Sequence, residues 1–140
     1  MQNKVITMKI EEKQLKYQKY FDLLDDPLSQ SEYLIQLGLK HKKEPELQTD
    51  YFRIEGCKTA IWIKTSENTP TVSFQCDSDS LLVKGILSIY EDLYQRCSQE
   101  QIQSHPPAFL EKISEDVIYP EIKRNGLLKC YKKIAHITSN

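Results

Sequence analysis

The sequence predicts an α+β fold, in which helices flank a small antiparallel sheet of about three strands. The first observation behind this prediction is a change in the spacing of apolar residues. They recur every three or four positions before residue 41 and after residue 80, but every second position in much of the segment between. The second observation is that the predicted strands are short and closely linked, which favours antiparallel pairing. With 140 residues, the chain is expected to form a single domain, residues 1–140.

Two helices are expected at the N-terminal end. The first covers residues 9 to about 25, where aromatic and leucine side chains fall on one helical face. Asp26 and Pro27 predict a stop followed by a new start, because proline suits the first turn of a helix. The second helix is expected to end near Gly38 or His41, and a charged loop follows it.

Three strands are expected in the middle of the chain, at residues 51–54, 60–65 and 71–76. Gly56 interrupts the link between the first two strands, and residues 66–70 are expected to turn the chain into the third. Apolar and polar residues alternate along the third strand, so one of its faces is expected to lie against the core. The residues on that buried face are Val72, Phe74 and Cys76.

Helices are expected again after the sheet. Ser78 or Asp79 would cap the first of them, because short polar side chains accept hydrogen bonds from the first backbone amides of a helix. This helix is expected to run to about Arg96 and to bury leucine and isoleucine side chains. The remaining helices are expected to begin after Ser98, at Pro106 and after Pro120.

The composition is that of an ordinary soluble globular protein, with 39% hydrophobic and 28% charged residues. A formal net charge of -1 gives no reason to expect nucleic-acid binding, which needs a clustered positive field. No apolar run approaches the ~18 residues that cross a bilayer, so no membrane partner is expected. The N-terminus shows no secretory signal. A cytoplasmic location is therefore expected, where thiols stay reduced.

The cysteines and histidines show no spacing typical of a metal or redox site. The four cysteines stand far apart without a CxxC pair, and the three histidines show no ligand spacing. We therefore expect no resident cofactor and no bound metal. Cys76 is expected to be inert in the core, and the histidines expected at the surface are His41, His105 and His136.

Cys57 is the first candidate for chemistry. It follows Gly56 directly, between two predicted strands, and glycine allows the backbone angles that a tight loop requires. A cysteine in such a loop is well placed to meet the sulfur of another protein, because the thiolate is a nucleophile. From its position alone, Cys57 is equally well interpreted as a buried structural cysteine, because free cysteine is among the most buried residue types. The apolar neighbours expected to shelter the thiol until a partner moves the loop are Ile54, Ala60 and Ile61.

Three sequence blocks resemble the SufE family in their order and spacing. The first is the Gly-Cys pair followed by a tryptophan, formed here by Gly56, Cys57 and Trp62. The second combines Asp77, Ser78 and Asp79 with Val83, Lys84 and Gly85. The third, near the C-terminus, is Arg124, Asn125, Gly126 and Leu127. A fourth, weaker feature is the segment of residues 21–25 followed by Glu32, Tyr33 and Leu34. Together the blocks cover most of the chain, which is identified on them as similar to SufE proteins.

Two departures from the family pattern concern the surroundings of Cys57. Lys58 and Thr59 stand where the family has glutamine and serine, and Lys123 replaces an arginine. Lysine cannot reproduce the planar fork of arginine, so partner docking and the anchoring of the loop are expected to differ. The residues that the resemblance assigns to loop or docking support are Gly56, Lys58, Thr59, Trp62, Asp77, Asp79, Lys123 and Arg124.

Structural roles compete with these functional ones. Trp62 is expected to pack in the core, since a large aromatic side chain on a strand is well used there. Asp77 and Asp79 are expected to serve as helix caps rather than catalytic acids. A solvated face is expected for the cluster of Lys129, Lys132 and Lys133, with docking of an acidic partner as the alternative.

The resemblance implies a sulfur acceptor and carrier with a SufE/IscU-like fold. Its partners would be a pyridoxal-phosphate-dependent cysteine desulfurase similar to SufS, whose turnover it would raise, and an iron–sulfur scaffold complex similar to SufBCD. Cys57 would hold the sulfur as a persulfide. The carrier would need no cofactor and would not be a stand-alone enzyme. The oligomeric state is open, a homodimer included.

Two rival functions are left open. A metal- or cluster-binding scaffold normally needs several thiolates that converge on one site, whereas only Cys57 lies in the motif loop. A non-catalytic adaptor would dock a desulfurase and change its activity without receiving sulfur. Replacement of Cys57 separates the adaptor from the carrier, because the adaptor would keep its stimulation.

Overall fold

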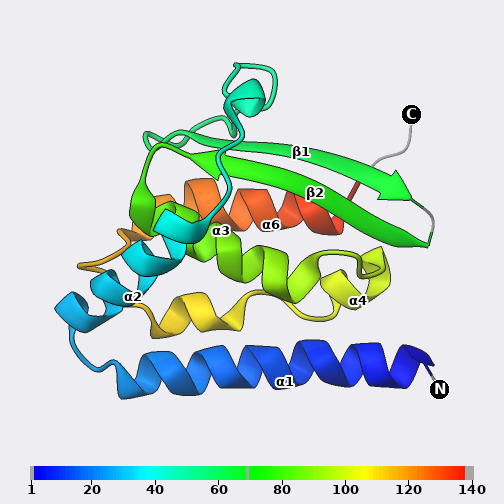
Figure 1. Cartoon of the computed structure of the whole chain (residues 1–140), viewed down its shortest axis with the longest axis horizontal. Coiled ribbons are helices and arrows are strands. Elements are labelled where there is room, and N and C mark those ends of the chain that lie inside the picture. The colour runs from blue at the N-terminus through cyan, green and yellow to red at the C-terminus, as the bar shows by residue number, and fades with distance from the viewer. Residues whose placement is uncertain (1, 69, 138–140) are drawn as a thin grey trace.

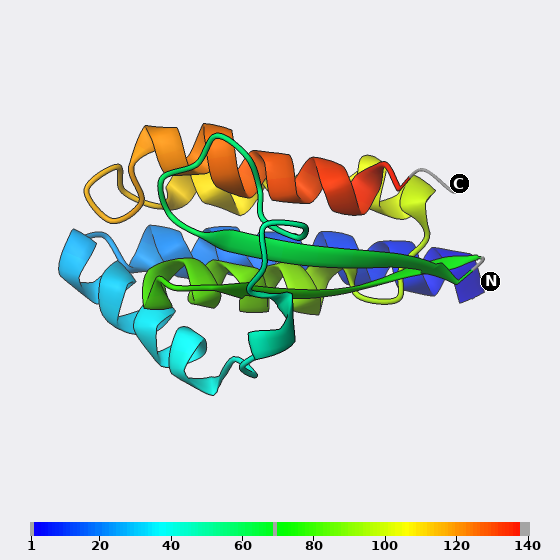
Figure 2. The same ribbon diagram turned by 90° about the horizontal axis from the view of Figure 1, so that it is seen from above.

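The computed structural model describes residues 2–68 and 70–137, with the side chains of residues 10–66 and 70–137. It confirms the α+β fold, in which helices pack around a two-stranded antiparallel hairpin (Figure 1). The hairpin consists of β1 (Ile61–Asn68) and β2 (Thr71–Ser78). Seen from above, it lies across the middle of the molecule, with the C-terminal helix on one side and the second helix on the other (Figure 2).

The first two helices meet where the sequence predicts. α1 (Gln2–Leu23) begins earlier than expected, and α2 (Pro27–Lys40) follows after a short turn. The Asp26 carboxylate caps α2 by accepting a hydrogen bond from the Ser29 amide at 2.8 Å. His41 closes the other end of α2, since its amide donates to the carbonyls of Leu37 and Gly38.

Two glycines allow α2 to cross α3 (Leu81–Tyr94) with the two backbones in contact. A Cβ atom added to Gly38 would overlap the carbonyl oxygen of Leu81, and one added to Gly85 would overlap that of Leu34. The apolar face of α3 is buried beneath the hairpin, as its periodicity predicts. The glycine contact therefore fixes α2 against the element that carries much of the core.

The hairpin has two strands within the described residues rather than about three. Residues 51 and 52 lie in a turn, and the segment meets β1 at one bridge between Arg53 and Trp62. Two backbone hydrogen bonds support that bridge, from Ile54 N to Ile61 O at 2.8 Å and from Ile63 N to Phe52 O at 2.9 Å. The pairing stops there because the backbone turns at residues 49–53 on one side and at Gly56 on the other.

The hairpin is also longer than expected toward its tip. β1 continues to Asn68, so Ser66 and Glu67 belong to the strand instead of the predicted turn. Asn68 pairs with Thr71, and Thr69 lies outside the described residues. The alternation along β2 is confirmed, since the three residues predicted to face the core are each at most 4% exposed: Val72, Phe74 and Cys76.

The outer edge of β2 is covered by the chain that leaves α3. The Gln95 side chain donates to Phe74 O at 2.9 Å and accepts from Phe74 N at 2.8 Å, as a neighbouring strand would. Arg96 has a φ of 64°, the left-handed conformation that ends many helices. After this turn, the Arg96 amide donates a hydrogen bond to Val72 O, and the Val72 amide donates one to Cys97 O, both at 2.8 Å. The helix therefore ends at Tyr94, before the expected Arg96.

The predicted cap of α3 is wrong by one or two residues. Ser80 is the N-cap, and its hydroxyl accepts from the Val83 amide at 3.3 Å. Ser78 is engaged elsewhere, because its hydroxyl donates to the carbonyl of Ala60 at 2.6 Å. Asp79 is exposed one residue before the cap.

The C-terminal third is built from short helical pieces. α4 (Gln99–Gln103) follows a capping box at Ser98, and a 3₁₀ turn, η2 (Ala108–Lys112), follows the two prolines. The last helical run consists of α5 (Pro120–Ile122), a π-helical turn η3 (Lys123–Leu127) and α6 (Leu128–Ala135). Within residues 2–68 and 70–137, no helix combines the length and apolarity that a membrane span requires.

Candidate functional site

Cys57 lies in the loop that leads into β1, as the sequence predicts. Gly56 has a φ of +84°, which glycine adopts without the strain that a side chain would bring. The turn carries Cys57 inward, so that the residue is only 6% exposed although its neighbours Gly56 and Lys58 are exposed. The thiol is therefore sheltered at the base of an exposed loop.

A close approach of helix backbone forms one wall of this shelter. Gly126 lies in η3, where the amide of Leu128 reaches back to the carbonyl of Lys123 in π-helical geometry. A Cβ atom at Gly126 would lie 2.8 Å from Cys57 Sγ and 2.9 Å from Ile61 Cδ1. Two of the three residues expected to shelter the thiol, Ile54 and Ile61, belong to the same apolar cluster as Cys57, and the third, Ala60, is buried but lies outside that cluster. Only glycine at position 126 leaves room for the sulfur.

Lys129 holds the loop from its solvent side. Its ammonium group donates a hydrogen bond to the carbonyl oxygen of Glu55 at 2.8 Å. The same Nζ atom would lie 2.8 Å from a Cβ added to Gly56. Since the bond is exposed and reaches a single carbonyl, it can be exchanged for water when the loop moves.

A hollow opens beside Cys57 and joins charged side chains of both signs. It has a volume of about 600 Å³, and its lining residues are Asp50, Arg53, Ile54, Glu55, Gly56, Cys57, Lys58 and Glu121. A second hollow of about 360 Å³ shares four of these residues and adds Tyr51, Lys129, Lys132 and Lys133. The lysine cluster of α6 is exposed, as a solvated face is expected to be, and it also borders the Cys57 loop.

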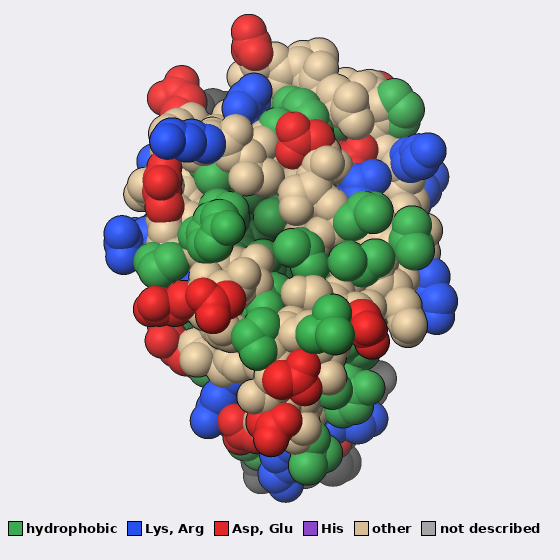
Figure 3. All heavy atoms as spheres, turned by 90° about the vertical axis from the view of Figure 1, so that its left-hand side faces the viewer, with side chains coloured by type: hydrophobic (Ala, Val, Ile, Leu, Met, Phe, Trp, Pro, Cys, Tyr) green, Lys and Arg blue, Asp and Glu red, His purple; other side chains and the backbone are tan. Residues whose placement is uncertain are grey.

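Figure 3 shows the end of the molecule at which β1 begins and α1 gives way to α2. Hydrophobic side chains gather on this end among acidic and basic ones (Figure 3). The element ends there carry three strongly exposed apolar side chains, Leu23, Leu28 and Tyr119, with exposed fractions of 79%, 69% and 63%. This surface has the mixed apolar and charged character of a contact area for another protein.

Asp77 is a buried structural anchor and not a helix cap. Its carboxylate accepts hydrogen bonds from the amides of Glu44 at 3.1 Å and Ser78 at 2.8 Å, and from Gln48 Nε2 at 3.2 Å. The Lys84 ammonium lies 3.4 Å away. Burial by itself would raise the pKa of Asp77, but the hydrogen bonds and Lys84 together hold the pKa below its ordinary value. Asp77 thus fastens the turn η1 (Pro45–Leu47) to β2 and α3.

The remaining predicted site residues are spread over different surroundings. Trp62 is only half-buried, because Ile61 and Ile63 take the inward positions of β1 and Trp62 faces the other side. The expectation of a core tryptophan is therefore wrong. Thr59 is half-buried beside Lys58, and Asp79 is exposed.

Lys123 and Arg124 do not reach the cysteine loop. Lys123 donates to the carbonyl of Ile113 at 2.6 Å, and its partial burial lowers the pKa of its ammonium group. Arg124 is exposed on η3. The cysteine loop is anchored instead by Lys129, six residues after Lys123.

The other three cysteines lie in the core and are poorer nucleophiles. Burial raises the pKa of the Cys76 thiol well above its ordinary value, with Cys130 and Glu91 adding to the effect. Burial also raises the pKa of Cys97, and it raises that of Cys130 to about 12. Because a raised pKa removes the reactive thiolate, these positions are poor sulfur acceptors.

A sequence model of the SufE family, described as an Fe-S metabolism associated domain, matches residues 16–138. The chain belongs to the SufE family. Its role therefore lies in iron–sulfur metabolism. The SufE match covers the cysteine loop, the hairpin, α3 and the helical run that shelters Cys57.

The sequence blocks of this SufE protein meet in space. Gly126 of the third block packs on Cys57 of the first. Ser78 of the second block binds the carbonyl of Ala60, at the end of the cysteine loop. Gly126 and Lys129 were not predicted as site residues. The sequence does contain one indication of the role of Gly126. A glycine inside a helical stretch destabilises the helix, so its presence usually indicates a close packing contact.

Substitution of Gly126 by alanine is expected to force Cys57 out of its shelter in this SufE protein. The new methyl group would crowd Sγ. Such overpacking destabilises the sheltered state of the loop by about 1–3 kcal/mol relative to the exposed state. That free energy corresponds to roughly a 5- to 150-fold increase in the population of the loop with its thiol exposed. We expect alkylation of Cys57, followed by mass spectrometry, to accelerate by a factor in this range.

The matched control for this experiment is Asn125→Ala, on the same turn of η3. It should leave the alkylation rate of Cys57 near that of the unaltered protein. Should a folded Gly126→Ala protein react no faster than the Asn125→Ala control, the assignment of Gly126 as the wall of the shelter is wrong.

Proposed function

We propose that this SufE protein accepts sulfur as a persulfide on Cys57 and carries it to an iron–sulfur scaffold. The donor is a pyridoxal-phosphate-dependent cysteine desulfurase similar to SufS, and the recipient is a scaffold complex similar to SufBCD. The observation that carries the proposal is the placement of Cys57. It is the cysteine of the family motif, it lies in a glycine-hinged loop, and it borders an open hollow.

The transfer step is an exchange between two sulfur atoms. The Cys57 thiolate attacks the outer sulfur of the desulfurase persulfide, and a new sulfur–sulfur bond forms on Cys57. The bond between that outer sulfur and the desulfurase cysteine breaks, and the desulfurase leaves as a thiolate. No external oxidant or reductant is needed. Removal of the persulfide frees the desulfurase for its next turnover, which is how the carrier stimulates it.

The charged lining of the hollow supports this chemistry. Arg53 and Lys58 border the same space as Cys57, and cationic side chains favour the approach of an anionic sulfur. Asp50, Glu55 and Glu121 lie on the same lining, so the hollow carries charges of both signs.

The docking surface proposed for the desulfurase combines the rim of the cysteine loop with the lysines of α6. Lys129, Lys132 and Lys133 border the second hollow together with Tyr51, which is 86% exposed. Exposed tyrosines are effective contact residues, and a basic rim favours an acidic partner surface. A desulfurase that captures Lys129 would release its bond to Glu55 and free the loop.

The free thiols agree with a reducing compartment, and we propose a cytoplasmic location. All four cysteines are unpaired: Cys57, Cys76, Cys97 and Cys130. Among the residues that the structure describes, Cys57 belongs to no group of converging metal ligands. A scaffold that builds a cluster on Cys57 therefore has no support from the geometry of this site.

The proposal is tested by locating the transferred sulfur. The protein is incubated with a cysteine desulfurase and cysteine, and its intact mass is measured before and after digestion into peptides. We expect the addition of one sulfur atom, found on the peptide that contains Cys57. Sulfur found instead on Cys76, Cys97 or Cys130 would overturn the proposal.

A further inference from the structure

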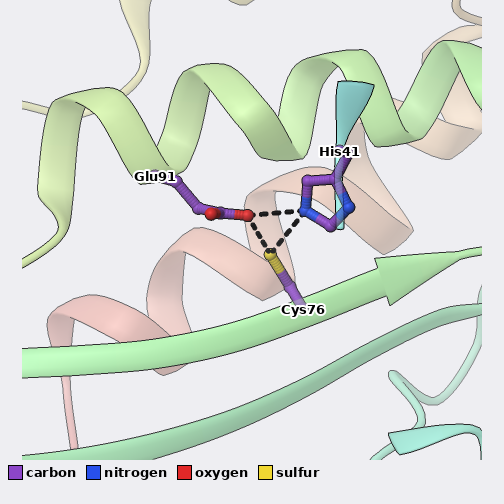
Figure 4. Close-up of side chains that lie close together, drawn as sticks. All are labelled: His41, Cys76 and Glu91. Atoms are coloured by element: carbon purple, nitrogen blue, oxygen red, sulfur yellow. Dashed lines mark hydrogen bonds and ion pairs between the residues drawn. The ribbon is translucent and has the colours of Figure 1, made fainter. Parts of the chain in front are cut away.

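A second group of reactive side chains lies apart from the cysteine loop. His41 at the end of α2, Cys76 on β2 and Glu91 on α3 point toward one another (Figure 4). His41 Nε2 lies 2.5 Å from Glu91 Oε1 and 4.0 Å from Cys76 Sγ. Cys76 Sγ lies 3.6 Å from the same Glu91 oxygen. Three different donor atoms thus converge from three separate elements.

The group is closed toward the core and open on one side. The His41 side chain is 4% exposed and Cys76 is 1% exposed, whereas the Glu91 side chain is 37% exposed. The expectation that His41 lies at the surface is therefore wrong. Its position follows from the end of α2, where the chain turns over the space between β2 and α3. The open side at Glu91 gives an entry path from solvent.

The two ring nitrogens of His41 have different surroundings. Nδ1 is buried and has no hydrogen-bond partner in the described part of the chain. Nε2 instead lies against the Glu91 carboxylate, which can accept a hydrogen bond from it, so a metal ion bound at Nε2 would replace that hydrogen bond. With the proton on Nδ1, Nε2 presents its lone pair toward Cys76 and Glu91.

We propose that His41 Nε2, Cys76 Sγ and a Glu91 carboxylate oxygen bind one zinc ion, with water as the fourth ligand. Nitrogen, thiolate sulfur and carboxylate oxygen are the ligands that zinc takes in proteins. At ordinary zinc bond lengths, a tetrahedral ion holds such donors about 3.3–3.6 Å apart. The two sulfur distances are close to that range, and the short contact between His41 and Glu91 opens by about 1 Å. Glu91 can supply this movement because its side chain reaches solvent.

The ligand set favours zinc over other common ions. Magnesium and calcium prefer shells made of oxygen alone, so a thiolate and an imidazole disfavour them. The ion would link the end of α2 to the hairpin and to α3, and the glycine contact already brings two of these elements, α2 and α3, together. The sequence predicts no metal site because these residues are far apart along the chain. His41 and Cys76 are 35 positions apart, and Cys76 and Glu91 are 15 positions apart. No short spacing motif could reveal it.

The test uses the whole chain, freed of metal with a chelator. Zinc is added in competition with a chromophoric chelator, and cobalt(II) is added separately to detect a thiolate-to-cobalt charge-transfer band. We expect one zinc ion per chain, a higher melting temperature with zinc, and the cobalt band. Cys76→Ala and Glu91→Gln should each weaken zinc binding by at least about 100-fold, since loss of even an outer partner of a ligand costs about 10- to 100-fold.

Two control variants separate this site from the sulfur site and from nonspecific thiol binding. Cys57→Ser and Cys97→Ala should keep both the zinc affinity and the cobalt band. Glu91→Gln keeps the shape of a half-exposed side chain, so it remains informative if Cys76→Ala fails to fold. Less than stoichiometric zinc in the unaltered protein, an unchanged cobalt band in Glu91→Gln, or loss of the band in Cys57→Ser would overturn the proposal. None of these readouts depends on sulfur transfer.

Discussion

Substitution of Cys57 by serine is expected to abolish sulfur loading completely when the protein is incubated with a desulfurase and cysteine. A serine hydroxyl is a far weaker nucleophile than a thiolate and cannot hold a persulfide. The substitution removes one sulfur atom from a site beside an open hollow, so the fold should be preserved. The intact mass of the variant should stay unchanged, and stimulation of the desulfurase should be lost.

The matched control is Cys97→Ser, at a buried cysteine whose thiol donates to the Leu93 carbonyl at 3.5 Å. A serine hydroxyl can make that bond, so this variant should fold and load sulfur normally. If Cys57→Ser still stimulates the desulfurase fully, the protein is an adaptor and not a carrier. Sulfur loading that persists in Cys57→Ser would show that another thiol is the acceptor.

Substitution of Gly85 by alanine should cause the largest loss of stability of any single methyl group added to this fold. The new Cβ would overlap the backbone oxygen of Leu34, and a backbone atom cannot rotate away as a side chain can. α2 and α3 would have to separate along their whole contact. We expect the free energy of unfolding to fall by at least about 3 kcal/mol, the upper part of the range for overpacked cores.

Urea denaturation followed by circular dichroism measures this loss. The control is Gln36→Ala, at an exposed position of α2, which should change the free energy of unfolding by less than about 0.5 kcal/mol. A Gly85→Ala protein that unfolds within 1 kcal/mol of the original, on the order of an ordinary point mutation, would show that the helices do not touch there.

The features that could be predicted from the sequence depend on neighbouring residues. The buried face of β2 follows from the alternation of Val72 and Phe74, and the start of α2 follows from Asp26 and Pro27. In each case the physical cause involves residues that are only a few positions apart in the sequence. For β2 it is the alternation between the two faces of a strand, and for α2 it is the capping of the first turn. The Cys57 loop was found in the same way, from the glycine beside it.

The features that could not be predicted depend on contacts between distant segments. Gly126 shelters Cys57, and His41 meets Cys76, only because helices from elsewhere in the chain are folded against the hairpin. Asp77 was expected to be a cap because short acidic side chains favour that role. Its actual partners, Glu44 and Gln48, come from a loop whose path the local sequence does not determine.

The covered outer edge of β2 limits how the hairpin can associate with other chains. An open strand edge offers unpaired amides and carbonyls that invite self-association and aggregation. Here the Gln95 side chain and the backbone of Arg96 and Cys97 already use the hydrogen-bonding groups of Val72 and Phe74. An added strand, whether from a second copy or from a partner, therefore cannot pair with β2 at Val72 and Phe74. On its β2 side, the hairpin is thereby protected at Val72 and Phe74 from pairing with a second copy of itself.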